Sequence, residues 1–258
     1  MKKASLPKVS VLIPAYNEEK YIYRTLTAIL AQDYPDYEVI VANNASTDQT
    51  ALLIQQLIDR QPATGIPPIR MVCEEQKGTN FAREAARKLA TGDIIAQLDA
   101  DCVPASSWLR KGVRALLQHP HRVAVTGPYD YFDGNPQMRF FSLLSQQLTY
   151  PLISNLAQIA GRAAILIGGN AFVHASVLEK AGGYNTDLTF YGDDIDLGKQ
   201  LTQFGTIAYL PSLVQPSSSR RYQANGFWEV NKKYQDCFWN LIWRKNNILT
   251  TTETSHPR

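Results

Sequence analysis

The stretch Ile94-Ile95-Ala96-Gln97-Leu98-Asp99-Ala100-Asp101-Cys102-Val103-Pro104 decides the fold. Its mostly apolar beginning predicts a buried strand over residues 94–98, and Asp99 and Asp101 follow where this strand ends. Open α/β sheets bind ligands at the carboxyl ends of their strands. Two carboxylates one residue apart can converge there on a divalent cation such as Mg²⁺. A polar turn with a helix cap is the alternative, because short Asp-x-Asp patterns also arise by chance.

The first half of the chain alternates strands and helices. Apolar runs and helical spacings of apolar residues predict the order strand 9–14, helix 21–32, strand 37–42, helix 51–60, strand 69–73, helix 79–90 and strand 94–98. Short strand–helix links call for a parallel sheet with right-handed crossovers, which is a doubly wound α/β domain with helices on both faces. Each strand ends in polar residues. We therefore expect four polar loops at one sheet edge, where a nucleotide could contact all of them.

The composition fits a globular protein in a reducing compartment. Of 258 residues, 45% are hydrophobic, and the net charge of +3 is too small to indicate a nucleic-acid partner, although it suits anionic small molecules or an anionic membrane surface. The cysteines Cys73, Cys102 and Cys237 lack metal-site spacing, so we expect reduced thiols in the cytoplasm. No signal peptide and no run of roughly 18–20 apolar residues is visible, so any membrane contact should be peripheral, at the inner face of the cell membrane.

Two segments of the second half admit more than one interpretation. Residues 138–159 are apolar and aromatic, and they predict either two core-covering helices broken at Pro151 or a surface helix for a membrane or a partner chain. Residues 227–247 mix aromatic and basic side chains, which is typical either of a final helix packed on the core or of a membrane-surface helix. Residues 250–258 are expected to be disordered.

Two other segments carry candidate functional residues. Residues 165–173 indicate a strand pair or a bent strand interrupted by two glycines, and glycine in a strand often marks close approach of the backbone to a ligand. Residues 216–222 indicate a mobile loop with Arg220 and Arg221. Such a loop could close over bound phosphates and clamp them.

Asp193, Asp194 and Asp196 place three carboxylates in four positions, at the expected start of a helix that runs to residue 204. The positive end of a helix dipole favours negative charge at this place. Capping explains one of these carboxylates but does not easily explain all three. The cluster therefore indicates a second functional group of acidic residues besides Asp99 and Asp101.

Taken together, several stretches resemble the family 2 glycosyltransferases of the GT-A fold. The motifs that carry the resemblance are 9–18, 39–50, Lys77-Gly78 with Ala82-Arg83, Asp99-Ala100-Asp101, 168–170, 182–184 and 192–197. Each motif is weak alone, but their common order along residues 9–204 is specific. The resemblance implies a GT-A nucleotide-sugar-binding and catalytic domain over residues 1–210. Residues 211–258 would then be a basic, aromatic extension of helix and loop that covers the active site or contacts a membrane.

The resemblance also implies a chemistry. It points to an inverting, metal-dependent enzyme that moves one sugar from a nucleoside diphosphate sugar, a UDP-sugar being favoured, to an acceptor hydroxyl. Asp194 would be the general base, and Asp101 with Asp99 would hold Mn²⁺ or Mg²⁺. Arg220 and Arg221 would clamp the diphosphate. The nucleotide-binding residues would be Pro14, Ala15, Tyr16, Glu18, Asn43, Gly78, Arg83 and Asp99, and the sugar-binding residues would be Gly169, Asn170 and Asp193.

This sequence departs from the family pattern at three places. Asn43 stands where the family usually has an aspartate near the nucleotide base, which leaves the choice of base open because an amide is neutral and both donates and accepts hydrogen bonds. Asp193 replaces the usual glutamate. The Gln-x-x-Arg-Trp motif of processive members is absent, which favours transfer of a single sugar.

Two rival functions stay open from the sequence alone. A nucleotidyltransferase also uses a parallel sheet and metal-binding aspartates, but residues 15–18 replace its usual glycine-rich, lysine-containing loop. A catalytically inactive nucleotide-sugar-binding scaffold is the other rival, and the presence of Asp99, Asp101 and Asp194 argues against it. The acceptor could be a glycan, a lipid-linked molecule or a small molecule, as in cell-envelope glycan biosynthesis. A homodimer is compatible with the sequence.

Overall fold

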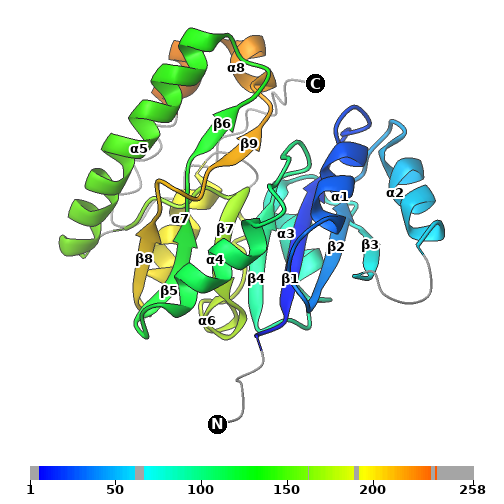
Figure 1. Ribbon diagram of the computed structural model, residues 1–258, viewed down its shortest axis with the longest axis horizontal. Helices are drawn as coiled ribbons and strands as arrows, with labels where there is room; N and C mark the ends of the chain where they lie inside the picture. The colour runs from blue at the N-terminus through cyan, green and yellow to red at the C-terminus, as the bar shows by residue number, and fades with distance from the viewer. Residues whose placement is uncertain (1–5, 62–66, 162, 189–191, 234–235, 237–258) are drawn as a thin grey trace.

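A seven-stranded sheet forms the centre of the molecule (Figure 1). The computed structural model describes residues 6–61, 67–161, 163–188, 192–233 and 236. The strand order is β3-β2-β1-β4-β7-β5-β8; β7 is antiparallel to both its neighbours and the other pairs are parallel. The strands are β1 (Val9–Ala15), β2 (Tyr37–Asn43), β3 (Ile69–Cys73), β4 (Ile94–Leu98), β5 (Arg122–Thr126), β7 (Asn170–His174) and β8 (Thr206–Tyr209). The predicted doubly wound, mostly parallel sheet is confirmed.

Helices cover both faces of this sheet, and each face has its own core. The side chains of β1 alternate between the two, since Ile13 belongs to the first core and Leu12 to the second, as the period of two in a strand requires. Side chains of α1 (Ile22–Leu30), α2 (Thr50–Asp59) and α4 (Trp108–Leu117) fill the first core, and those of α3 (Thr79–Arg87), α6 (Ala175–Lys180) and α7 (Asp193–Leu201) fill the second.

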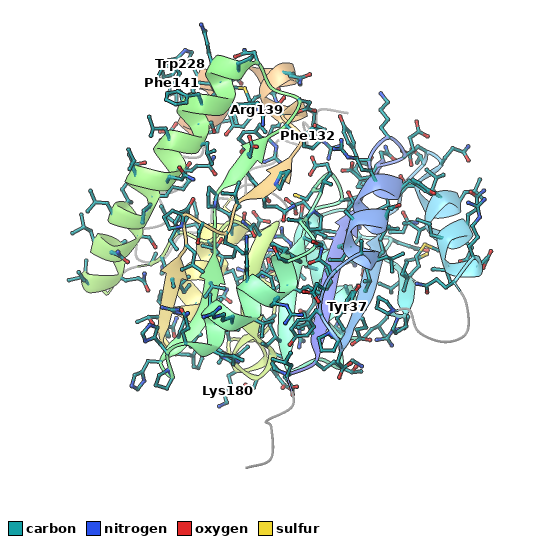
Figure 2. All side chains as sticks on the ribbon, in the orientation of Figure 1. Tyr37, Phe132, Arg139, Phe141, Lys180 and Trp228 are labelled. Carbon is teal, nitrogen blue, oxygen red and sulfur yellow. The ribbon has the colours of Figure 1, made fainter. Side chains whose placement is uncertain are left out.

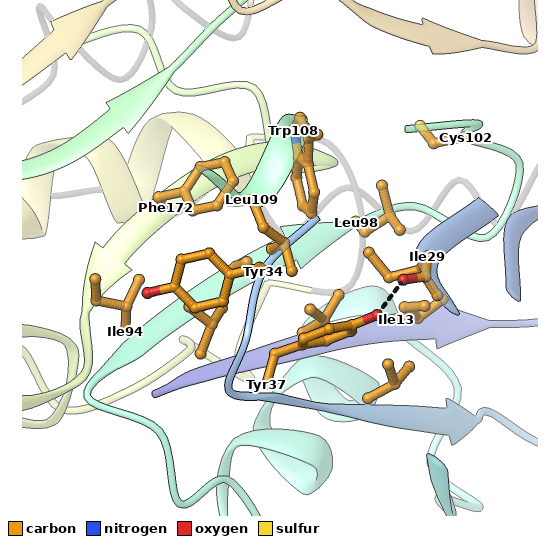
Figure 3. Packing of buried hydrophobic residues seen from close by; sticks show 14 of the residues in the cluster. Ile13, Ile29, Tyr34, Tyr37, Ile94, Leu98, Cys102, Trp108, Leu109 and Phe172 are labelled. Carbon is orange, nitrogen blue, oxygen red and sulfur yellow. Dashed lines mark hydrogen bonds between the residues drawn. The ribbon is translucent and has the colours of Figure 1, made fainter. Parts of the chain in front are cut away.

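Aromatic side chains close the first core (Figure 3). The ring centroids of Trp108 and Phe172 are 4.6 Å apart, which joins α4 to β7. A Cβ atom added at Gly112 would lie 2.1 Å from the Phe172 ring, so a glycine at this position allows α4 to approach the strand. The Tyr37 hydroxyl donates a hydrogen bond of 2.9 Å to the Ile29 carbonyl at the end of α1. These contacts hold α1 and α4 against one face of the sheet.

The strands that precede the polar loops run in one direction. Ala15 pairs with Asn43, and Asn43 pairs with Cys73, so β1, β2 and β3 end side by side. β4 pairs with β1 in the same sense and is followed directly by Asp99. The four polar loops therefore share one sheet edge, as predicted.

A single helix, α5 (Pro136–Ile159), contains Pro151, and the interpretation as two helices broken at this proline is wrong. Proline removes one backbone hydrogen bond, and contacts on both sides of it keep the helix continuous. Before the proline, Gln146 bonds the backbone of Tyr129; after it, Gln158 bonds the backbone of Ile207.

Two further expectations need correction. Strand β7 begins only at residue 170, because Gly168 turns its N–H toward the Asp194 carboxylate instead of a neighbouring strand. Residues 216–222 are not a loop: β9 (Gln215–Ser217) pairs with β6 (Tyr129–Tyr131), and α8 (Arg220–Asn225) follows. The segment is ordered by residues distant in sequence, since Asp133 accepts hydrogen bonds from the Ser218 hydroxyl and the Ser219 N–H.

The described part of the C-terminal extension packs on the domain. Leu213 belongs to the first core, and β9 contributes to the small sheet with β6. Residues 227–233 are helical, as expected. Most of 234–247, and all of 250–258, lie outside the described residues, so the boundary at residue 210 and the disorder at the end stay predictions.

Within the described residues, none of the helices combines the length and the apolarity that crossing a bilayer requires.

Glu38 is buried in β2 and gives the fold a pH dependence. Burial raises the pKa of Glu38, but hydrogen bonds from Ser10 and Thr91 and the charge of Arg70 outweigh it and hold this pKa below its ordinary value. A lowered pKa stabilises the fold above the unfolded-state pKa, and this contribution is lost as the pH falls through the folded-state value. We expect Glu38→Gln to lower the free energy of unfolding by about 1–3 kcal/mol at neutral pH and by less in acid. Urea titrations at the two pH values measure the difference; equal losses at both would contradict the assignment.

Candidate functional site

A cleft of about 200 Å³ lies at the carboxyl ends of β1 and β4. Its walls come from the loops after β1, β2, β3 and β4, from the start of α7, and from β6, β9 and α8. The predicted site residues that line it are Pro14, Ala15, Tyr16, Glu18, Gly78, Arg83, Asp99, Asp101, Asp193, Asp194, Arg220 and Arg221. The fold thus brings together both acidic clusters of the sequence and both arginines of the predicted loop.

Arg83 connects the two acidic clusters. Its Nη1 lies 3.0 Å from Asp193 Oδ2 and 3.1 Å from Asp194 Oδ1, and its Nη2 lies 3.3 Å from Asp99 Oδ1. The residue is 3% exposed, on the face of α3 that packs against the sheet. Burial lowers the pKa of Arg83, but the three carboxylates outweigh this effect and raise it above the ordinary value. Arg83 therefore stays charged and holds the carboxylates at fixed positions.

Asp99 has a second partner that the sequence did not reveal. The Tyr129 hydroxyl donates a hydrogen bond of 2.8 Å to Asp99 Oδ2. Gln146 of α5 bonds both the N–H and the carbonyl of Tyr129 and so fixes its backbone. A Cβ atom added at Gly169 would lie 2.1 Å from the Tyr129 hydroxyl, so only glycine leaves room for this contact. No pattern in the local sequence marks Tyr129 as a functional residue, because it lies in a short strand of the irregular second half.

Asp101, Glu18 and Arg220 form a second charged group in the cleft. The Arg220 guanidinium makes a two-pronged ion pair with Glu18, and its Nε lies 3.3 Å from Asp101 Oδ2. Burial raises the pKa of Glu18 to about 7 and that of Asp101 to about 6, although Arg220 acts in the opposite direction on both. The carboxylates of Glu18 and Asp101 therefore both face the cleft, and a further positive charge nearby would stabilise their charged forms.

Asp194 sits in the first turn of α7. The Gly168 N–H donates a hydrogen bond of 3.0 Å to Asp194 Oδ2, and a Cβ atom at Gly168 would lie 2.0 Å from Asp194 Oδ1. Burial raises the pKa of Asp194, and Asp99 adds to this effect while Arg83 opposes it. Asp196 differs from its neighbours, because it does not line the cleft and accepts hydrogen bonds from Asn185 and Gln200.

Three predicted binding residues lie behind the cleft wall rather than on it. Asn170 is fully buried and bonds Trp108 Nε1 and the Leu213 carbonyl. Gly169 backs the contact between Asp99 and Tyr129, as described above. Asn43 is 8% exposed, and its Oδ1 has no hydrogen-bond partner among the described residues. Their direct contact with a nucleotide or sugar stays a prediction.

Asn44, which the sequence did not single out, connects two of the polar loops at the cleft. Its Oδ1 accepts a hydrogen bond of 2.8 Å from the Gly78 N–H, and its Nδ2 donates to the carbonyls of Glu74 and Gln76. Asn44 lines the cleft and ties the loop after β2 to the loop after β3. Gly78 has φ 149°, a conformation that favours glycine at the start of α3.

The donor set at Asp99 and Asp101 fits a hard divalent cation only in part. Both carboxylates face the cleft, and the desolvated Asp101 would be stabilised by positive charge. Within the described residues, no group of three or more acidic, histidine or cysteine side chains is arranged as a complete metal site. Mg²⁺ is commonly held by one or two carboxylates together with substrate phosphates and water, so two protein ligands suffice if a diphosphate supplies the others.

Comparison with known proteins adds the family. The chain matches the family model "Glycosyl transferase family 2" over residues 10–182. It is 31% identical over 207 residues to the glycosyltransferase AglE of Haloferax volcanii, which covers 78% of this chain and 64% of AglE. The chain therefore spans somewhat less than two thirds of the length of this relative.

Solved structures show the same architecture. The mannosyltransferase PcManGT of Pyrobaculum calidifontis, in complex with GDP-Man and Mn²⁺, is 25% identical with a TM-score of 0.65, over 89% of this chain and 61% of that protein. TarS of S. aureus, residues 1–349 with UDP-GlcNAc, is 20% identical with a TM-score of 0.59, over 82% of this chain and 58% of that one. The GT-A fold and the extent of the family match agree, and this chain belongs to glycosyl transferase family 2.

Proposed function

We propose that this chain transfers a single sugar from a nucleoside diphosphate sugar to an acceptor hydroxyl, with inversion and with the help of a divalent cation. The observation that carries the proposal is the cleft in which Arg83 bridges Asp99 on the donor side and Asp193 and Asp194 on the acceptor side. The buried Arg83 guanidinium thus joins the two halves of the proposed transfer site.

On the donor side, Asp101 and Asp99 would hold Mn²⁺ or Mg²⁺ against the diphosphate, and this cation would stabilise negative charge on the leaving group. The end of β1 with Pro14 and Ala15, the following residue Tyr16, and Gly78 would hold the nucleoside. Arg220 must exchange a carboxylate partner for phosphate before it can serve as a clamp, because it is bound to Glu18 and Asp101. Arg221 also lines the cleft and would assist.

On the acceptor side, Asp194 would act as the general base. Its carboxylate takes the proton of the acceptor hydroxyl while the hydroxyl oxygen forms a bond to the anomeric carbon. The bond from that carbon to the diphosphate breaks at the opposite face, so the configuration inverts. The Gly168 N–H and Arg83 hold Asp194 in place, which leaves its orientation fixed before the acceptor binds.

For the donor we propose a UDP-sugar, with Asn43 and Asn44 near the base. An amide side chain both donates and accepts hydrogen bonds, so it is compatible with uracil and also with other bases. The acceptor would be a glycan, a lipid-linked molecule or a small molecule, and the protein would work in the cytoplasm at the inner face of the cell membrane, in cell-envelope glycan biosynthesis. Family membership disfavours a nucleotidyltransferase, and a transfer assay separates an active enzyme from a scaffold.

A thermal-shift titration with UDP and GDP, each with and without Mn²⁺, tests the donor half of this proposal. We expect UDP with Mn²⁺ to stabilise the protein by about 2.7 kcal/mol at a hundredfold excess over Kd. Asp101→Asn should remove the Mn²⁺-dependent part of the shift. Asp130→Asn is the matched control, because Asp130 pairs with Arg139 outside the cleft and its loss should leave the shift unchanged. No shift with any nucleotide would exclude the donor assignment.

Tyr129→Phe tests whether the Asp99 geometry matters. The substitution keeps the ring and removes the hydrogen bond to Asp99 Oδ2. We expect the Mn²⁺ concentration needed for half-maximal nucleotide binding to rise by about 10- to 100-fold, since a hydrogen bond to a charged group contributes about 1.5–3 kcal/mol and about 1.4 kcal/mol corresponds to a factor of ten. Isothermal titration measures this, with Tyr34→Phe as the control, because the Tyr34 hydroxyl donates to the Pro7 carbonyl and Tyr34 does not line the cleft. An unchanged Mn²⁺ requirement would mean that Arg83 alone positions Asp99.

A further inference from the structure

The Arg220 side chain lies between two carboxylates of the cleft. Its Nη1 donates a hydrogen bond of 2.7 Å to Glu18 Oε2, its Nη2 pairs with Glu18 Oε1, and its Nε lies 3.3 Å from Asp101 Oδ2. The guanidinium also lies over the ring of Tyr21, at 5.2 Å from the ring centroid. The side chains of Glu18 and Asp101 are only 9% and 12% exposed, so Arg220 supplies a positive charge that these desolvated carboxylates require.

The backbone that carries Arg220 is held without the help of these ion pairs. Asp133 accepts a hydrogen bond from the Ser219 N–H, and β9 pairs with β6. The N–H of Phe132 (Figure 2) donates a hydrogen bond of 3.1 Å to the Ser217 carbonyl. The Arg220 side chain itself lines the cleft and is 31% exposed. It can therefore leave its carboxylates by rotation of the side chain alone, while the segment around it stays in place.

The ion pair with Arg220 involves a carboxylate that is also proposed to hold Mn²⁺ or Mg²⁺. Asp101 is thus already bound to a cation that belongs to the protein. Like charges repel strongly at close range in a poorly solvated cleft, so Asp101 cannot hold the guanidinium and a divalent cation together at low cost. Asp99 does not relieve this competition, because it is paired with Arg83 and accepts a hydrogen bond from Tyr129.

A diphosphate in the cleft would change this balance. Guanidinium groups bind phosphate oxygens in the same two-pronged manner as they bind carboxylates. Arg220 can then exchange its carboxylates for phosphate, which leaves Asp101 to the metal ion, and the same phosphates supply further oxygen ligands. The same departure without a diphosphate would leave both the guanidinium and Glu18 without their ion pair.

Given the donor role proposed above for the cleft, we propose that the Arg220 guanidinium is an internal cation that keeps Mn²⁺ or Mg²⁺ from Asp101 until a diphosphate draws the guanidinium away. The site then takes the metal ion together with a nucleoside diphosphate and discriminates against the metal ion alone. A nucleoside that lacks the diphosphate does not release Arg220.

Titration of the full chain with Mn²⁺, followed by the electron paramagnetic resonance signal of free Mn²⁺, tests the proposal. Arg220→Gln removes the internal cation. We expect this variant to bind Mn²⁺ alone at least about fivefold more tightly than the unmodified chain, and to bind UDP at saturating Mn²⁺ at least about fivefold more weakly. The loss of an arginine with a merely structural role would not strengthen the binding of Mn²⁺.

Two further variants serve as controls. Arg220→Lys keeps the charge, so its affinity for Mn²⁺ alone should stay closer to that of the unmodified chain than the affinity of Arg220→Gln does. Arg110→Gln removes an arginine that pairs with Asp33 and does not line the cleft, so it should change neither affinity. Thermal unfolding without ligand shows whether each variant keeps its fold.

The unmodified chain provides a test that needs no variant. UDP should strengthen Mn²⁺ binding by the protein at least about fivefold, after subtraction of the Mn²⁺ bound by free UDP, and uridine should not. Equal Mn²⁺ affinity with and without UDP would overturn the proposal, as would Mn²⁺ binding by folded Arg220→Gln that is no tighter than that of the unmodified chain; nucleotide binding with Mn²⁺ would in both cases still support the donor role. Failure of the unmodified chain to bind UDP or GDP at any Mn²⁺ concentration would remove the donor role, and this proposal with it.

Discussion

Arg83→Met is expected to lower the free energy of unfolding by about 3–5 kcal/mol, because removal of one partner of a buried ion pair leaves the other charges uncompensated. Here three carboxylates lose the same partner: Asp99, Asp193 and Asp194 all lie within 3.3 Å of the guanidinium. Methionine keeps much of the side-chain volume, so a cavity would account for little of the loss. Urea unfolding at neutral pH measures it.

The matched control is Arg87→Met on the same helix. Arg87 pairs with Glu84 one turn away, and both side chains retain contact with solvent. Such a pair contributes about 0–1 kcal/mol, so the control should unfold almost like the unmodified chain. Arg83→Lys should fall between the two, because lysine keeps the charge but cannot reach three carboxylates with a planar fork. Similar losses of unfolding free energy for Arg83→Met and Arg87→Met would show that the ion pairs of Arg83 stabilise the fold no more than a solvent-exposed pair does.

The second large effect concerns the reaction. Asp194→Asn is expected to reduce sugar transfer by about 10²–10⁴-fold, the usual contribution of a general base, while nucleotide binding persists. Asparagine preserves the shape of the side chain, and its Oδ1 can still accept the hydrogen bond from the Gly168 N–H. The rate of transfer and the nucleotide Kd should therefore separate in this variant.

Asp196→Asn provides the control on the same helix turn. Asp196 is bonded to Asn185 and Gln200 and does not line the cleft, so its substitution should leave the transfer rate within a small factor of the unmodified chain. The rates are measured with a range of acceptor hydroxyl compounds and a UDP-sugar with Mn²⁺. Near-normal turnover by Asp194→Asn would move the role of base to another carboxylate, with Asp193 as the next candidate because it lines the same cleft.

Local sequence patterns predicted the first half of the fold well. Strands 9–14, 37–42, 69–73 and 94–98 differ from the observed strands by at most one residue at an end. The buried runs and the helical spacings are properties of short segments, so they need no knowledge of distant partners. The second half was harder, because α5 carries its apolar residues on the outside and α8 depends on distant contacts.

The sequence likewise predicted only some of the residues of the candidate site. Motif order singled out Asp99, Asp101, Asp193 and Asp194, and all four line the cleft. It could not predict Tyr129, whose own neighbours carry no motif, or the burial of Asn170 behind the cleft wall. Nor could it predict that Arg220, expected on a mobile loop, lies in a helix and pairs with Glu18, 202 residues earlier in the chain.

By itself, the sequence determined the alternation of strands and helices, the shared edge of the polar loops and the family motifs, because periodicity and spacing act over a few residues. The tertiary structure alone decided that Asp99, Asp193 and Asp194 share Arg83, across separations of 16, 110 and 111 residues. Buried charges require a partner of opposite sign, but composition does not say which one; only the packing of α3 beneath the sheet edge brings that partner to all three. The two aspartates after β4 are thereby one side of a site whose other side begins α7.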